Sequence, residues 1–134
     1  MTQFNLSLET EIRKIVKKNE KKIVGLVRTR LYRYGVDGSG EKITPTYSMQ
    51  TIEYKKSKGQ ITSRVTLRDQ GLFYSGFYTT LEKNYTLLLN SSDEKTASLL
   101  DKYGETILHF TKQEQDFILN EIIDPGVEDL IKKL

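Results

Sequence analysis

Few residues in this chain have the types and spacing that catalysis or metal binding requires. The sequence has one histidine, His109, and no cysteine, and a lone histidine cannot form a usual transition-metal site. Ser75 lies between a tyrosine and a glycine rather than in the Gly-x-Ser-x-Gly frame of a hydrolase nucleophile. Three carboxylates occupy helix-start or solvent positions that the helix dipole explains: Asp93, Glu94 and Asp101. We therefore predict a protein that is not an enzyme and uses no cofactor or metal.

A glycine-rich segment over 35–41 could be mistaken for a ligand loop. A calcium loop needs acidic or amide ligands at alternate positions and a distant glutamate, but this segment offers only Asp37 and Glu41. A phosphate loop ends in Gly-Lys-Ser/Thr, which is missing here. We expect a loop or extended arm that orders against a partner.

Charge is distributed unevenly along the chain. Residues 1–68 contain 15 lysines and arginines and 6 acids, a net +9, whereas residues 69–134 contain 6 and 12, a net −6. A basic half and an acidic half could bind a polyanion, or could bind copies of the same chain head to tail. The second interpretation uses both halves, so we favour it.

Apolar residues from Ser7 to Tyr34 have the spacing of a long helix with one buried stripe. Lysines crowd its remaining surface, and four of them form a candidate basic surface: Lys14, Lys17, Lys18 and Lys21. A solvated helix face is the favoured interpretation, and non-specific contact with DNA is the alternative. No aromatic residue stands among these lysines to stack on a base, and three glutamates interrupt the positive charge.

Length and composition predict one domain over 1–134. The chain is long enough to bury a core, with 37% apolar and 29% charged residues. No apolar run approaches the roughly 20 residues of a membrane-spanning helix. We expect a protein without membrane contact that is made in the cytoplasm.

The expected fold class is α+β, with a long N-terminal amphipathic helix, a small antiparallel sheet built around a β-hairpin, and a helical C-terminal region. Its three parts are the long helix over 7–34, a flexible loop or arm region over 35–64, and the hairpin with the C-terminal helices over 65–134. Within the second part, residues 49–56 fit either a helix or a strand.

The C-terminal half carries several local signals. Apolar alternation on both sides of residues 82–84 predicts the hairpin. Ser91 or Ser92 is expected to cap a helix over 93–103 that ends at Gly104. Thr111 begins a capping box for a helix to Ile123, and Asp124-Pro125 is expected to break that helix and begin a last one.

The densest aromatic stretch, residues 65–78, lies where the charge changes sign. It predicts a turn through Thr66 to Asp69, one or two helical turns, and a strand that starts near Gly76. Its aromatic residues Phe73, Tyr74 and Phe77 suit a core or a subunit contact.

The order of these features resembles the virion morphogenesis (tail-completion) family of tailed bacteriophages. Four short motifs carry the resemblance, over most of residues 43–123: Tyr47-Ser48-x-x-Thr51-Ile52-x-x-Lys55, Leu67-x-Asp69-x-Gly71-x-Phe73, Lys102-Tyr103-Gly104 and Ile107-Leu108-x-Phe110-Thr111-x-x-Glu114. In the second motif, Leu67, Asp69 and Gly71 match the turn of the family, and the aromatic residues follow it.

The resemblance implies a structural protein of the virion neck or tail, made in the bacterial host and acting as a ring-forming head-to-tail connector or tail-completion component. It implies copies of itself and other neck, portal or tail proteins as partners, with no catalysis and no cofactor. A nucleic-acid-binding accessory protein that uses the basic N-terminal helix is the alternative.

Overall fold

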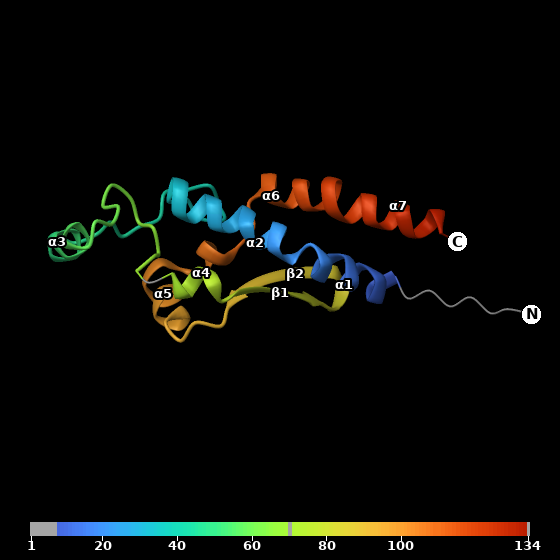
Figure 1. Cartoon of the computed structure of the whole chain (residues 1–134), viewed down its shortest axis with the longest axis horizontal. Helices are drawn as coiled ribbons and strands as arrows, with labels where there is room; N and C mark the ends of the chain where they lie inside the picture. The colour runs from blue at the N-terminus through green and yellow to red at the C-terminus, as the bar shows by residue number, and fades with distance from the viewer. Residues whose placement is uncertain (1–7, 70, 134) are drawn as a thin grey trace, which may run out of the picture.

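The computed structural model describes residues 8–69 and 71–133, and it has a mixed α+β fold. The N-terminal helices run through the middle of the molecule (Figure 1), with the C-terminal helical run along one side and the β-hairpin along the other. This arrangement gives α1 and α2 two apolar partners. Apolar residues on two faces of these helices are therefore buried, whereas their lysines are exposed.

The N-terminal helical run has three parts: α1 (Leu8–Lys18), α2 (Glu20–Thr29) and the π-helical segment η1 (Arg30–Tyr34). Asn19 interrupts it, because its side-chain amide donates to the carbonyl oxygen of Ile15 at 2.8 Å and competes with the regular helical bonding. Gly35 ends the run in the left-handed conformation, at φ +61°. The predicted long helix is therefore confirmed from residue 8, with a local break, and residue 7 lies outside the described residues.

The segment after this run folds onto its own chain. The carboxylate of Asp37 accepts hydrogen bonds from the backbone and hydroxyl of Ser39, at 2.9 and 2.6 Å, and from the hydroxyl of Thr106, at 3.2 Å. Partial burial opposes ionisation of Asp37, but these bonds hold its pKa below the usual value. The Asp37 carboxylate thus fixes the loop to which it belongs by bonding both Ser39 and Thr106. Beyond it, residues 49–56 are helical, in α3 (Met49–Ser57), with Ser48 as the N-cap.

The predicted hairpin is confirmed. Strand β1 (Phe77–Glu82) pairs antiparallel with β2 (Thr86–Ser91) across the turn η2 (Lys83–Tyr85), and the short helix α4 (Leu72–Ser75) precedes it. The buried and exposed residues of β1 alternate, as expected when one face of a strand packs on a core.

Helix α5 (Thr96–Tyr103) starts later than expected, so the predicted start at Asp93 with a Ser91 or Ser92 cap is wrong. Ser91 is the last residue of β2, and its hydroxyl donates to the carbonyl oxygen of Phe73 at 2.7 Å. That bond joins the end of β2 to α4, and the same hydroxyl accepts a bond from the backbone N–H of Asp93 at 3.3 Å. The predicted end at Gly104 is confirmed, and a 3-10 turn, η3 (Glu105–Leu108), follows.

The C-terminal helical run comprises α6 (Lys112–Phe117), the π-helical η4 (Ile118–Ile123) and α7 (Asp124–Lys132). The capping box of Thr111 and Glu114 is confirmed, but the predicted break at Asp124-Pro125 is wrong, because Asp124 has helical angles of −59° and −48°. Proline lacks the N–H that a regular α-helix requires. The wider π turn just before it changes the bonding register, which lets the run continue through Pro125.

Two apolar clusters form the core. The larger joins α2, the turn before α4 and the hairpin around Val27, Leu31, Ile43 and Ile107, each at most 2% exposed. The smaller lies between the N-terminal helices and η4, around Val16, Ile23, Ile118 and Ile122. No helix in the described ranges is both long enough and apolar enough to cross a membrane.

A buried ion pair connects the two helical runs. Arg30 Nε donates to the two carboxylate oxygens of Glu114 at 3.2 and 3.0 Å, and its other nitrogens donate to the carbonyl oxygens of Val36 and His109 at 3.0 and 2.7 Å. Glu114 also accepts from the backbone N–H of Thr111 at 2.9 Å. One guanidinium thus connects η1, the loop after it and the start of α6.

Candidate assembly surface

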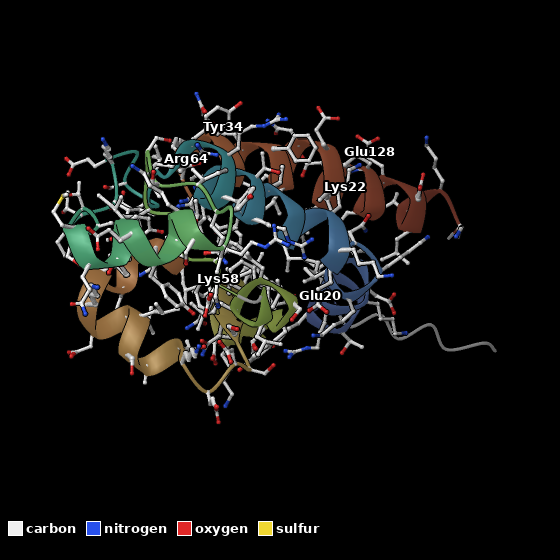
Figure 2. All side chains as sticks on the ribbon, turned by 60° about the vertical axis from the view of Figure 1, so that its left-hand side comes forward. Glu20, Lys22, Tyr34, Lys58, Arg64 and Glu128 are labelled. Carbon is white, nitrogen blue, oxygen red and sulfur yellow. The ribbon has the colours of Figure 1, made fainter. Side chains whose placement is uncertain are left out.

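The outer edge of β1 is closed by side chains of the N-terminal helices. The carboxylate of Glu20 accepts hydrogen bonds from the backbone N–H and the hydroxyl of Thr79, at 2.9 and 2.7 Å. Lys17 donates to the carbonyl oxygen of Thr79 at 2.9 Å, and Arg13 donates to that of Leu81 at 3.0 Å. Figure 2 shows Glu20 between these helices and the hairpin. No further strand can therefore pair with β1 here.

The outer edge of β2 is open. Leu89 lies opposite Thr79, and Leu87 lies opposite Leu81. Because Thr79 and Leu81 turn their backbone groups toward the helices, Leu87 and Leu89 belong to non-hydrogen-bonded pairs, and their N–H and C=O groups face away from β1. Within the described ranges, no backbone bond to either leucine is found outside the hairpin. This edge can accept another strand.

An apolar groove of about 1050 Å³ runs along the open edge. Ile12 and Val16 of α1 line it together with β2, and Ile118, Leu119 and Ile123 of the C-terminal run line it as well. The exposed fractions of two lining leucines are large, 46% for Leu88 and 52% for Leu119. Apolar side chains exposed together beside an open strand edge are typical of a protein interaction site.

The charged side chains that line the groove are acidic. Apart from His109, its only ionisable side chains among the described residues are the carboxylates of Glu82 and Glu105 and the phenols of Tyr78 and Tyr85. Both glutamates are exposed and belong to the half of the chain whose net charge is −6. A basic partner is therefore complementary to it.

Glu20 makes the closed edge sensitive to acid. Partial burial disfavours its charged form, but the hydrogen bonds from Thr79 and Lys17 outweigh that and lower its pKa below the usual 4.5. A carboxyl with a lowered pKa in the folded state stabilises the fold above its unfolded-state pKa, and this contribution is lost as the pH falls through the folded-state pKa.

We expect Glu20→Ala to lower the free energy of unfolding at neutral pH by about 1–3 kcal/mol, because it leaves the N–H of Thr79 without its acceptor. Urea unfolding at neutral pH and below pH 4.5 measures this, and the difference between wild type and variant should shrink in acid. Asp116→Ala is the control, because within the described residues the Asp116 carboxylate pairs with an exposed lysine one turn away, and the change should cost under about 1 kcal/mol. Equal losses in the two variants would contradict the role of Glu20.

The predicted basic surface is partly neutralised. Lys14 lies 3.4 Å from the carboxylate of Glu11, and Lys17 lies 3.0 Å from that of Glu20 in addition to its bond with the hairpin. Lys18 and Lys21 are exposed. The four lysines thus do not form one uncompensated patch, and Lys17 also bonds the backbone of the hairpin.

The residues of the Leu67-x-Asp69-x-Gly71-x-Phe73 motif lie in and beside a tight turn. Leu67 is buried and has a positive φ of 55°, and Gly71 has a φ of 82° and precedes α4. Asp69 is exposed, 3.6 Å from the ammonium group of Lys58. A role of this motif in assembly stays a prediction.

The aromatic residues that follow the turn pack inside the molecule. Phe73, Tyr74 and Phe77 are at most 9% exposed, and the ring of Phe77 lies 5.0 and 5.5 Å from the other two, edge to face. The hydroxyl of Tyr74 donates to the carbonyl oxygen of Thr66, and burial raises its pKa. The sequence predicted either a core position or a subunit contact for these three residues, and in the single chain they are part of the core.

We expect Gly71→Val to lower the free energy of unfolding by about 1–2 kcal/mol or more, because a β-branched residue is strained at φ 82°. Among the described residues, the side chain of Arg68 alone approaches the added Cβ, at 3.6 Å, so strain rather than crowding is the cause. Thermal unfolding of Gly71→Val and Gly71→Asn distinguishes strain from crowding, because asparagine tolerates a positive φ better than valine. A valine variant as stable as the wild type would refute the requirement for this backbone angle.

The surface described here was not visible in the sequence. The alternation that predicts β2 does not say which of its edges is covered, and the lysine and glutamate that close the β1 edge resemble any solvent-facing pair.

No family model, curated protein or solved structure matches this chain.

Proposed function

We propose that this chain is a structural virion protein of a tailed bacteriophage, a neck or tail-completion component that forms a ring and joins the head to the tail. One observation carries the assembly part of the proposal: β2 has an open edge along an apolar groove, whereas the edge of β1 is closed. The phage part rests on the ordered motifs between residues 43 and 123.

The proposed occupant of the groove is an extended segment of the neighbouring copy. Such a segment would bond to the backbone of Leu87 and Leu89 and place alternate side chains in the groove. Most of the residues that line the groove belong to the acidic half of the chain, and the other half carries a net +9, so a copy that offers its basic half is complementary in charge. A contact between two different surfaces of one chain closes into a ring when its rotation allows.

The alternative, a nucleic-acid-binding accessory protein that uses the basic N-terminal helical run, receives less support. Two of its four lysines have carboxylate partners, which reduces the charge available to phosphates.

The virion particle tests the proposal. We expect peptide mass spectrometry of purified virions from the phage that encodes this chain to detect it at several copies per particle, and electron microscopy to place it at the neck or tail end. Particles that lack the chain and still join heads to tails would refute the assignment.

A further inference from the structure

A second surface lies at the end of α2, outside the groove. Arg28, Arg33 and Arg68 line an open cleft of about 530 Å³ together with uncharged residues, and none of the described residues that line it has a carboxylate. All three arginines are exposed. We call it the arginine cleft; its other lining residues are Thr29, Tyr32, Gly71, Tyr74 and Ser75.

The arginines of the cleft have no carboxylate partner within the described ranges, although arginines and lysines elsewhere in the chain do. Cations near a helix C-terminus offset the helix dipole, which accounts for Arg28 and Arg33. It does not account for Arg68, which comes from the separate segment before α4. Like charges brought together from distant segments without a counter-ion destabilise the fold, so the cleft suits a bound anion.

The cleft is partly preorganised. The guanidinium groups of Arg64 and Arg68 lie 5.9 and 5.3 Å from the ring centre of Tyr32, and Arg64 Nε donates to the carbonyl oxygen of Tyr32 at 2.8 Å. Figure 2 shows Arg64 on the same side as the end of α2. Because these contacts engage the ring of Tyr32 and Tyr74 is buried, neither tyrosine among the described residues of the cleft is free to stack on a base.

We propose that the arginine cleft binds the phosphates of a DNA backbone without reading the bases. Guanidinium groups suit phosphate oxygens because their N–H donors form a planar fork that can bond two oxygens at once. Charge without base contacts gives binding that is independent of sequence and weakens with salt. This inference does not depend on the proposed function.

Fluorescence anisotropy with a labelled 20-base-pair duplex, from low to moderate salt, tests the cleft. We expect the triple variant Arg28→Gln/Arg33→Gln/Arg68→Gln to bind at least about tenfold more weakly and to reduce the slope of log affinity against log salt by about three. The matched control Lys14→Gln/Lys18→Gln/Lys21→Gln removes the same charge. Its loss of log affinity for the duplex should be less than half of the loss in the arginine variant. If circular dichroism shows that the triple arginine variant is unfolded, Arg28→Gln/Arg33→Gln replaces it.

Four results would overturn the proposal. The first is no binding of wild type at low salt, and the second is an equal or larger loss in the lysine variant, which would mean that net charge alone attracts DNA. The third is displacement of the duplex by millimolar inorganic phosphate at constant ionic strength, which would assign the cleft to a free anion instead. A duplex of unrelated sequence should bind equally well, and a strong sequence preference would also contradict the proposal.

Discussion

Arg30→Met should lower the free energy of unfolding by about 3–5 kcal/mol, because it leaves the carboxylate of Glu114 buried without its counter-ion. The side chains of this pair are only 8% and 10% exposed. The carbonyl oxygens of Val36 and His109 lose their donor in the same substitution. Since small domains are stable by about 5–15 kcal/mol, we expect the midpoint of urea unfolding to fall sharply.

Two controls accompany this prediction. Lys112→Ala removes an ion pair whose lysine is 82% exposed, and should cost under about 1 kcal/mol. Arg30→Met/Glu114→Met should lose less stability than the sum of its single changes, because no isolated buried charge remains. A loss below about 1 kcal/mol for Arg30→Met alone would mean that the pair does not hold the two helical runs together.

Leu119→Lys should weaken self-association by about 30- to 150-fold, because it removes about 2–3 kcal/mol of apolar burial from the interface. Leu119 is 52% exposed in the single chain and lines the groove, so the fold should tolerate the change. A lysine there also repels the basic half of the neighbouring copy. Sedimentation velocity over a concentration series measures the loss.

Ile131→Lys is the matched control for this variant. Ile131 lies on α7, is 58% exposed and does not line the groove, so the same substitution should leave self-association unchanged. If both variants associate like the wild type, the groove is not the contact between copies. If both lose association equally, the effect comes from added charge rather than from the groove.

Local signals in the sequence predicted much of the fold. The capping box at Thr111, the glycine after η1 and the alternation in the hairpin depend on neighbours a few residues apart, and the structure contains all three. Pro125 misled the prediction because its usual effect assumes regular α-helical bonding before it, and η4 is π-helical. Nothing in the residue types around Pro125 indicates that change of register.

Features that join distant segments could not be predicted in this way. Arg30 and Glu114 are 84 positions apart, and the capping box to which Glu114 belongs does not indicate a distant partner for its carboxylate. Position 30 does lie on the apolar stripe with Val27 and Leu31, so a charged residue there was the available signal for a buried partner. The open edge of β2 and the arginine cleft likewise depend on which helices cover which strand, which only the tertiary structure determines.

The molar mass of the purified wild-type chain tests the proposed assembly most directly. Light scattering coupled to size-exclusion chromatography, at low and moderate salt, should give a multiple of the 15.5 kDa chain, with a larger oligomeric fraction at low salt because opposite charges attract across the contact. Closed rings should appear in electron micrographs of the same fraction. A strict monomer of 15.5 kDa at every concentration and salt would contradict a ring that forms through the β2 edge.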